Sequence, residues 1–466
     1  MPTEALPDGV LAPQHRAFGY PPGPAGGDGA PRALFNDLES LPTPDLDDYF
    51  AALGGSPLAT AVRPAVVLET SRGCWWGAIS HCTFCGLNGG SMGFRTKSPG
   101  KALAEFEGFA ERFGVRHFHV ADNILALEYF DSLIPMLAAS RLDANIFFET
   151  KSNLKREQVR ALAAAGVHWI QPGIESLSSA ALKLMGKGVP AWSNVLLLKW
   201  ARESRLHVIW FMLWGFPGES DVWYEEMAGW LPLIAHLQPS RGLNRLTYDR
   251  FSPYHFRAAE YGLDLRPCEP LRSVLDMPDA DLADQAYFFD DANEKLEGHP
   301  SWQVRGTRRP GIEVLQAAHE RWVREFNGDP QALLTMHDRD GRLHVCDTRR
   351  CAPRAEATLE GAARAACLAA GDGPTSSRLL HKLVADFGLE IDAEELEPIL
   401  ADLREQRLLL TLDGHHVALP LQVPVPAWPR RFDFPGGAID AEESLRLEND
   451  RPQPSLGSRF LALVDA

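Results

Sequence analysis

Cysteine is scarce in this chain, which has only 7 cysteines among 466 residues. So small and odd a number does not suit a disulfide framework, and it favours a reducing compartment. The sequence also lacks any apolar run of about 18 residues or more, and its start, MPTEALPDGVLAP, lacks a basic segment followed by an apolar one. We therefore predict a cytoplasmic protein with neither a signal peptide nor a membrane partner.

Positive charge is also in short supply. The chain has 46 Lys and Arg against 62 Asp and Glu, a net charge of −16. This charge repels nucleic acid and anionic membranes, so we predict no nucleic-acid partner. The rest of the composition, 45% hydrophobic and 23% charged, is that of a globular protein with enough chain for two or three domains.

The pattern of residues changes at position 65. Residues 1–64 are rich in Pro, Gly and Ala, and we expect an extended or loosely ordered segment in which LPTPDLDDYFAAL forms a short helix on the main domain. From 65 to 255, apolar β-rich runs alternate with helical patterns. The expected strands are 65–69, 117–121, 145–149, 168–173, 207–213 and, more weakly, 245–251. In the helix after 145–149 we expect Asn153 as N-cap and Gly166 after the end.

Six such repeats predict an α/β fold, a partial (β/α)6 barrel similar to a TIM barrel, with parallel strands inside and helices outside. The functional face of such a barrel lies at the carboxyl ends of its strands. We expect a helical extension over the barrel at 256–330 and a winged-helix-like module at 331–423. That module has two hairpins turning at Asp340-Gly341 and Asp413-Gly414, with three helical runs between them. Residues 424–466 read as a flexible tail.

Three of the seven cysteines gather in CWWGAISHCTFCG, directly after the first expected strand: Cys74, Cys82 and Cys85. Structural zinc takes four closed ligands. Three thiolates on a [4Fe–4S] cluster instead leave one iron open. His81 next to Cys82 is an awkward fourth zinc ligand. Zinc and simple burial as small apolar side chains remain alternatives, but the position after strand one favours an iron–sulfur cluster.

The segment ETSRGCWWGAISHCTFCGLNG resembles the cluster loop of radical S-adenosylmethionine (SAM) enzymes. More narrowly, it is similar to the group called RiPP maturation radical SAM protein 1, which has a Cys-x7-Cys-x2-Cys loop. RiPPs are ribosomally made, post-translationally modified peptides. The similarity continues through FRTKSP, ADNIL, FETKSNL, QPGIESLS, LMGKG, WGFPGES, RFSPYH and AYFF, from about residue 40 to 295.

The resemblance implies that the three cysteines hold a catalytic [4Fe–4S] cluster, where SAM binds the open iron. It also implies SAM-binding roles for residues at the strand ends: Asp122, Asn123, Glu149, Lys151, Gln171, Glu175, Gly215, Gly218 and Arg250. Structural alternatives stay open for several of these. Asp122 suits an Asx turn, Lys151 an exposed surface, and Arg250 a structural salt bridge. Trp75 and Trp76 either exclude water from the cluster or pack beneath the loop.

The same resemblance implies an electron donor of the flavodoxin or ferredoxin type. Most relatives in the group are cobalamin-dependent methyltransferases with a cobalamin domain ahead of the barrel. Only 73 residues precede Cys74, they lack strand alternation, and they contain no Asp-x-His-x-x-Gly. Such a domain needs on the order of 100 residues. We therefore expect no cobalamin.

Two kinds of acceptor remain open. A cobalamin-free branch of the group resembles the enzyme that begins arsinothricin biosynthesis, which moves the 3-amino-3-carboxypropyl group of SAM to trivalent arsenic. The sequence then offers four further cysteines as soft arsenic ligands or, more simply, as buried thiols: Cys268, Cys346, Cys351 and Cys367. The alternative is maturation of a RiPP precursor peptide, because the 331–423 module resembles winged-helix elements that bind leader peptides at a sheet edge.

Nucleic-acid binding by the winged helix is disfavoured. Between Pro353 and Pro420 there are twelve acidic and six basic residues. A module with this acidic excess lacks a phosphate-binding surface. We therefore predict a radical SAM enzyme, with a leaning towards group transfer to a small acceptor in antibiotic biosynthesis.

Overall fold

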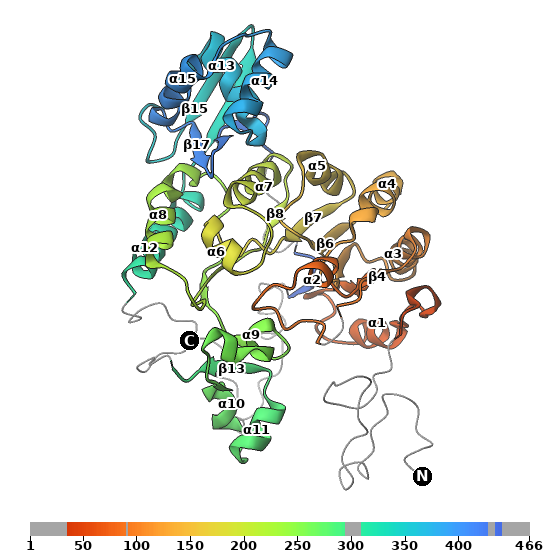
Figure 1. Ribbon diagram of the computed structural model, residues 1–466. Helices are drawn as coiled ribbons and strands as arrows, with labels where there is room; N and C mark the ends of the chain where they lie inside the picture. The colour runs from red at the N-terminus through yellow and green to blue at the C-terminus, as the bar shows by residue number, and fades with distance from the viewer. Residues whose placement is uncertain (1–34, 90–91, 294–308, 427–433, 440–466) are drawn as a thin grey trace, which may run out of the picture.

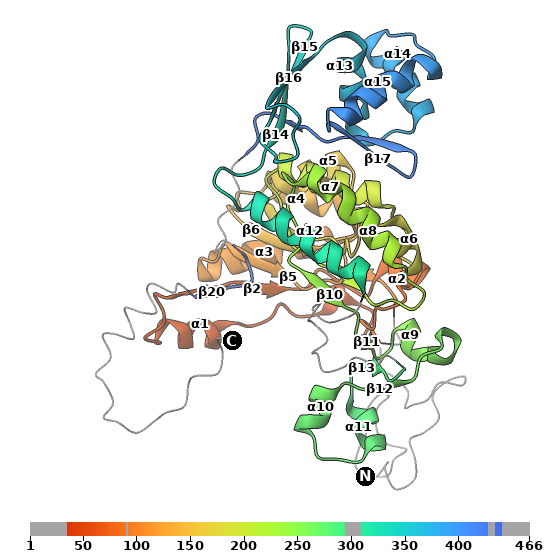
Figure 2. The same cartoon turned by 90° about the vertical axis from the view of Figure 1, so that its left-hand side faces the viewer.

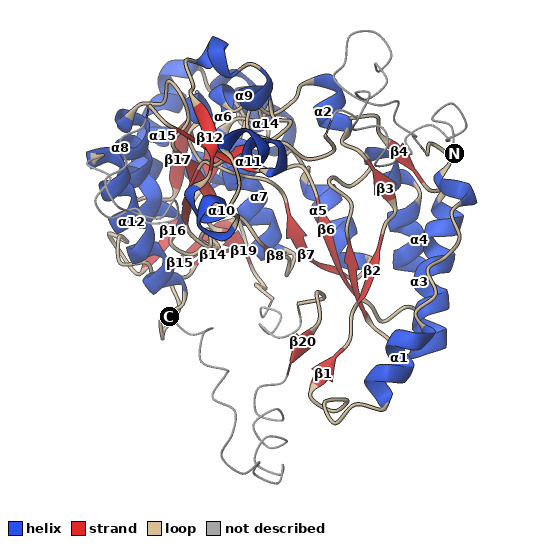
Figure 3. Ribbon diagram, turned by 90° about the horizontal axis from the view of Figure 1, so that it is seen from below, coloured by secondary structure: helices blue, strands red, loops and turns tan. Residues whose placement is uncertain are grey.

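The computed structural model describes residues 35–89, 92–293, 309–426 and 434–439. Its centre is a five-stranded sheet in which every neighbouring pair is parallel and the strands follow chain order. The strands are β2 (Val66–Leu68), β5 (His117–Val120), β6 (Asn145–Glu149), β7 (Val167–Gln171) and β8 (His207–Val208). Helices cover the outer face of this curved sheet (Figures 1 and 3). This arrangement confirms the predicted parallel α/β architecture.

The fifth and sixth strands differ from the expected ones. The run 207–213 is split into β8 and β9 (Met212–Trp214), and β9 pairs in parallel with β10 (Leu243–Arg245) in a separate two-stranded sheet. Strand β7 ends at Gln171, and the chain then turns through Gly173 and Glu175, both at positive φ. Residues 210 and 211 therefore have no β7 residue to pair with. A single bridge from Glu175 to Met212 links the two sheets. The barrel is therefore a half barrel made of two parts.

The outer helices follow from amphipathic stretches with recognisable ends. They are α3 (Pro99–Phe113), α4 (Leu133–Ala139), α5 (Arg156–Ala164), α6 (Ser179–Leu184), α7 (Ala191–Glu203) and α8 (Asp221–Trp230). The expected cap of α5 was wrong: Lys155, not Asn153, is the N-cap, because its backbone N–H is satisfied by the Gln158 side chain. Gly166 follows the helix at positive φ, as expected.

The described part of the N-terminal segment is more ordered than expected. It contains η3 (Leu38–Ser40), α1 (Asp47–Gly54) and β1 (Val62–Arg63). The α1 helix lies on the barrel, as predicted: Phe50 stacks on Phe113 of α3 with ring centroids 4.2 Å apart, and Asp47 pairs with Arg112. The prediction for residues 1–34 lies outside the described residues.

The extension after the barrel is not wholly helical. It contains α9 (Pro253–Phe256), η6 (Ala258–Tyr261), β12 (Leu265–Pro267), α10 (Glu269–Val274), α11 (Asp279–Gln285), β13 (Phe288–Asp291) and α12 (Pro310–Phe326). Strand β13 lies between β12 and β11 (Tyr248–Asp249) in a small antiparallel sheet. This sheet ties the extension to the end of the barrel chain. Helix α12 packs along α8, and its Trp322 donates to the Leu237 carbonyl at 2.8 Å.

The C-terminal module contains both expected hairpins and the three helices. Its elements are β14 (Leu334–Arg339), β15 (Arg342–Asp347), β16 (Glu356–Leu359), α13 (Gly361–Ala369), η7 (Ala370–Asp372), α14 (Ser376–Phe387), α15 (Ala393–Glu405), β17 (Leu409–Leu412), β18 (His415–Ala418) and β19 (Leu421–Gln422). A second sheet, in the order β16-β15-β14-β19, completes it. Its winged-helix character stays a prediction. Figures 1 and 2 place the module at the opposite end of the molecule from α10 and α11.

The tail is not flexible throughout. Strand β20 (Ala438–Ile439) pairs antiparallel with β1. Just before it, the Phe434 ring packs edge-on against Phe147 and Trp169 inside the half barrel, with centroids 5.6 and 5.2 Å apart. The expectation of a loose segment fails here because an aromatic side chain fills the apolar interior. The rest of the tail beyond residue 439 lies outside the described residues.

Candidate active site

The cysteine loop begins where the first parallel strand ends. After β2, the pair β3 (Ser71–Arg72) and β4 (Arg95–Thr96) closes its base, and between them lies the short helix α2 (Trp75–Ile79). Gly73 has φ +90°, and a Cβ there would lie 2.2 Å from the Gly93 carbonyl oxygen, so only glycine fits. Cys74 is the N-cap of α2, and its Sγ accepts the Gly77 N–H at 3.2 Å.

The three loop thiols are partly buried and lie close enough to affect one another. Burial and the charges of the other two cysteines raise the pKa of the Cys85 thiol to about 12. Burial also raises the pKa of Cys82, while Lys187 and Lys151 oppose that shift. Within the described ranges, no three His, Cys, Asp or Glu side chains are already arranged as a metal site. The loop thus brings the three thiols near one another, but their sulfur atoms are not arranged around a common centre.

The donor set itself fits a group held by three cysteines. His81, the adjacent alternative ligand, uses Nε2 in a 2.7 Å hydrogen bond with the Cys85 carbonyl oxygen. That bond ties the imidazole to the loop backbone through Nε2. Three partly exposed thiols on one loop at the carboxyl edge of the sheet suit a [4Fe–4S] cluster with one open iron.

Asp122 is placed for structure. Its buried carboxylate accepts the Thr70 N–H at 2.7 Å, the Thr70 hydroxyl at 2.5 Å and the Ser71 hydroxyl at 2.8 Å. Burial raises the pKa of Asp122 to about 6. Neighbouring Asn123 donates to the Asn88 side chain at 2.6 Å. Asp122 therefore holds the base of the cysteine loop, and Asn123 holds its far end. Both carboxylate oxygens of Asp122 already accept hydrogen bonds.

Glu149, Gln171 and Glu175 follow adjacent strands and are partly exposed. Burial, with the negative charges of Glu175 and Asp122, raises the pKa of Glu149 to about 7. Glu175 lies at φ +59° and pairs with Lys187 at 3.5 Å. The ends of β6 and β7 thus carry two neighbouring carboxyl groups, one of which is paired with Lys187.

Gly215 and Gly218 stand in the loop after β9, both at positive φ. Glu219, which the sequence reasoning did not single out, organises this loop: its carboxylate accepts the Gly215 and Phe216 N–H groups, each at 2.8 Å. It also pairs with Arg309 from outside the barrel. A Cβ at Gly218 would meet nothing within 4 Å, so that exposed position is not crowded by other atoms.

Arg250 does not face the strand ends with a free guanidinium. Its Nε donates to the Ala286 carbonyl at 2.6 Å, and a second nitrogen donates to the Ala283 carbonyl near the end of α11. The side chain thus fixes the extension to the barrel. Gly86, beside Cys85, packs on the same segment: a Cβ there would lie 2.1 Å from the Arg250 carbonyl oxygen.

Lys151 and the two tryptophans hold the loop from the other side. The Lys151 Nζ lies 3.7 Å from the centroid of a Trp76 ring and donates to the Lys187 carbonyl. Trp75 Nε1 donates to the Leu125 carbonyl at 3.0 Å. Lys187, in LMGKG, is a site neighbour that the motif contained but the sequence reasoning did not assign. Its signal was a lysine between two glycines.

Comparison with known proteins now adds to this geometry. Residues 68–231 match the family model of the radical SAM superfamily. This part of the chain is similar to radical SAM domains. That match supports the prediction of an enzyme, and radical SAM domains use a [4Fe–4S] cluster and SAM. Such enzymes act on small molecules or peptides with an electron donor.

One curated relative is an uncharacterised methyltransferase of Pyrococcus horikoshii, 27% identical over 199 residues. The match covers 41% of this chain and 40% of the relative's length. Among solved structures, the domain is similar to Kitasatospora setae TsrM with cobalamin and a [4Fe–4S] cluster bound: 16% identity, TM-score 0.38, covering 44% of this chain and 42% of that one. The cobalamin-dependent radical enzyme OxsB has 16% sequence identity and a TM-score of 0.35, and the match covers 81% of this chain and 49% of OxsB. TM-scores this low carry no argument.

The RiPP group and the arsinothricin resemblance are not confirmed, and the expected absence of cobalamin stays a prediction. In the described ranges, no helix has both the length and the apolar character needed to span a membrane. The cytoplasmic location stays a prediction.

Proposed function

We propose that this protein is a radical SAM enzyme that cleaves SAM and transfers a SAM-derived carbon group to an acceptor. The observation that carries the proposal is the cysteine loop, which joins the end of the first parallel strand beside the carboxylates that end β6 and β7. Cys74, Cys82 and Cys85 would hold the cluster. When bound, such a cluster supplies the electron that breaks a C–S bond of SAM.

The residues of the chain have separate parts in this proposal. Glu149 and Glu175 attract the ammonium group of SAM, and Gln171 offers an amide to its polar groups. Gly215 and Gly218, both at positive φ, allow a flat ring to approach the backbone closely. Trp75 and Trp76 keep water from the loop, which protects a reactive carbon radical. Asp122 and Arg250 act indirectly: Asp122 holds the cysteine loop in place, and Arg250 holds the extension.

For the transferred group we favour 3-amino-3-carboxypropyl and for the acceptor trivalent arsenic. Three of the four cysteines outside the loop give this no help. Cys367 is buried in α13, Cys351 donates to the Pro232 carbonyl at 3.2 Å, and Cys346 is exposed on β15.

Modification of a peptide is the second candidate, favoured by a feature of the module. Strand β16 pairs with β15 on one side, and in the described residues no strand pairs with its other side. A free sheet edge is the element that binds an extended peptide by main-chain hydrogen bonds. The methyltransferase name of the Pyrococcus relative supports methylation as the chemistry in this case.

Product analysis separates these candidates. The full chain is reconstituted anaerobically with iron and sulfide, reduced with dithionite and given SAM, with and without arsenite. Aminocarboxypropyl transfer yields 5′-methylthioadenosine and an arsenic–carbon product. The usual cleavage yields 5′-deoxyadenosine, and methyl transfer yields S-adenosylhomocysteine. If SAM stays intact in the reduced, cluster-loaded protein, the proposed function is wrong.

A further inference from the structure

Lys151 is a buried cation with an unusual set of contacts. The residue is 6% exposed. Its Nζ lies over the Trp76 ring at 3.7 Å and donates to the backbone carbonyl of Lys187. Among the described residues, no carboxylate lies within ion-pair distance of it. Burying an ammonium without an anionic partner is costly, so the position calls for a negative group nearby.

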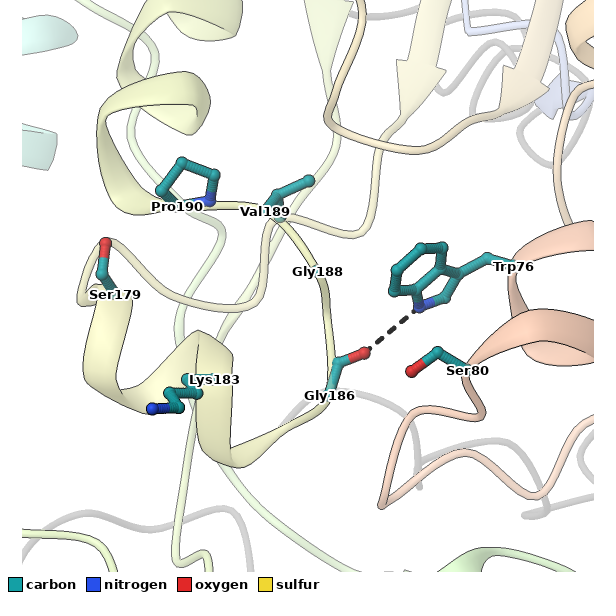
Figure 4. A pocket seen from close by; sticks show the side chains of 8 residues that line it. All are labelled: Trp76, Ser80, Ser179, Lys183, Gly186, Gly188, Val189 and Pro190. Atoms are coloured by element: carbon teal, nitrogen blue, oxygen red, sulfur yellow. Dashed lines mark hydrogen bonds between the residues drawn. The ribbon is translucent and has the colours of Figure 1, made fainter. Parts of the chain in front are cut away.

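The segment that holds Lys151 runs along the cysteine loop. Thr83 N–H donates to the Met185 carbonyl at 3.0 Å, and a Cβ on Gly186 would lie 3.8 Å from the Cys82 Cα. The Gly186 carbonyl accepts the Trp76 indole N–H at 3.2 Å, as Figure 4 shows. Residues 185–188 thus join Lys151 and Trp76 to the chain at Cys82.

Gly188 fixes the Trp76 ring in this assembly. A Cβ at Gly188 would come within 2.2 Å of the indole, so the ring lies flush against the backbone. The outer side of the ring lines an open pocket of about 430 Å³ that Lys183 and Pro190 also line (Figure 4). Trp76 therefore lies between solvent and Lys151, which keeps water from screening the lysine charge.

The direction of Lys151 separates it from the other candidate SAM contacts. Its Nζ reaches the outer 186–188 segment, whereas Glu149, two residues earlier, interacts with the charges of Glu175 and Asp122. The charges of Lys151 and Lys187 both favour the thiolate of Cys82. Two cations close behind one cysteine are the arrangement that stabilises a more negative metal–thiolate centre.

We propose that Lys151 is a positioning residue that sets the reduction potential of the cluster held by the cysteine loop. Reduction adds one electron, supplied in the test by dithionite, and hence one negative charge to the cluster. The ammonium group, shielded by Trp76, stabilises that charge and makes the potential less negative. This inference rests on the proposed function, because it needs a cluster on Cys74, Cys82 and Cys85.

The test is a potentiometric titration of the reconstituted full chain, followed by EPR, in the absence of SAM. We compare Lys151→Gln with Lys151→Arg, which keeps the charge. The matched control is Lys183→Gln, which removes a lysine that is exposed and directed away from Trp76 in Figure 4. Iron content and circular dichroism confirm that each variant is folded and loaded.

We expect a more negative midpoint potential for Lys151→Gln, with the other two variants close to the wild type. A wild-type midpoint in Lys151→Gln together with weakened SAM binding would overturn the inference and return Lys151 to SAM binding. An equal shift in Lys183→Gln would also overturn it. If Lys151→Gln binds no iron, the midpoint potential is measured in Lys187→Gln instead. A wild-type midpoint potential in that variant would overturn the inference. A wild type with no EPR signal refutes the proposed function instead.

Discussion

At the scale of single residues, Asp122 shows how a motif position and its role can separate. The sequence resemblance implies contact with SAM, yet the carboxylate accepts three hydrogen bonds from Thr70 and Ser71. Asp122→Ala leaves these buried donors unsatisfied, so we expect a loss of about 2 to 4 kcal/mol in the free energy of unfolding.

Urea unfolding of the metal-free protein measures this loss. Asp131→Ala, at an exposed position, is the control and is expected to change stability by at most about 0.5 kcal/mol. Unchanged stability in Asp122→Ala, combined with weaker SAM binding, would restore the role that the resemblance implies.

Glu149 gives the site a pH dependence. Its pKa in the folded protein is raised to about 7 by burial and by neighbouring negative charges. Because the raised pKa means that folding favours the protonated carboxyl, its contribution to stability is full below about pH 4.5 and is lost as pH rises through 7. We expect metal-free Glu149→Gln to match the wild type near pH 4.5 and to be about 1 to 2 kcal/mol more stable at pH 8. Denaturant titrations at both pH values check this, and a pH-independent difference contradicts it.

At the scale of elements, Gly86 couples the cysteine loop to the extension. A Cβ there would meet the Arg250 carbonyl oxygen at 2.1 Å and the Asp249 Cβ at 2.6 Å. Backbone atoms cannot move aside cheaply, so Gly86→Ala is expected to cost about 2 kcal/mol and to reduce iron incorporation. In α3, Gly100→Ala meets nothing within 4 Å and should stabilise the helix slightly. Thermal unfolding and iron analysis compare the two, and equal behaviour would rule out the proposed contact.

The sequence predicted those elements whose signals are local. The parallel strands that lead to Cys74, Asp122 and Glu149 follow from short apolar runs between helical patterns, and Gly166 was recognised as the residue that follows α5. The split between β8 and β9 was missed, because it depends on where Glu175 turns away from the neighbouring strand. The carbonyl contacts of Arg250 and the stacking of Lys151 on Trp76 were missed for a similar reason: both partners are distant in sequence.

At the scale of the whole molecule, a segment late in the chain helps to complete the barrel. Phe434 packs against His119, Phe147 and Trp169 from three different strands. Phe434→Ala removes a half-buried ring from this interior, and we expect a loss of about 2 kcal/mol. Phe256→Ala is the control, since that ring is 62% exposed. Differential scanning calorimetry tests the pair, and an unchanged melting temperature for Phe434→Ala would show that the tail contributes nothing to the barrel.

The module is joined to the barrel by buried polar contacts. Lys199 of α7 donates to the Ala418 carbonyl at 2.7 Å, and Arg349, which pairs with Asp347 inside the module, donates to the Leu233 carbonyl of the segment after α8. Apolar residues of the barrel, α12 and the module also form one continuous core. A peptide held at β16 would therefore be presented by a part of the molecule that is fixed to the barrel.

The central claim is that Cys74, Cys82 and Cys85 together hold one redox-active iron–sulfur cluster. EPR of the anaerobically reconstituted, dithionite-reduced protein tests it most directly, with Cys82→Ala as the variant and the exposed Cys346→Ala as the control. The account predicts a reduced [4Fe–4S] signal in the wild type and in Cys346→Ala, and its loss in Cys82→Ala. A wild type that holds zinc in place of iron, or a Cys82→Ala protein with the full signal, would contradict it.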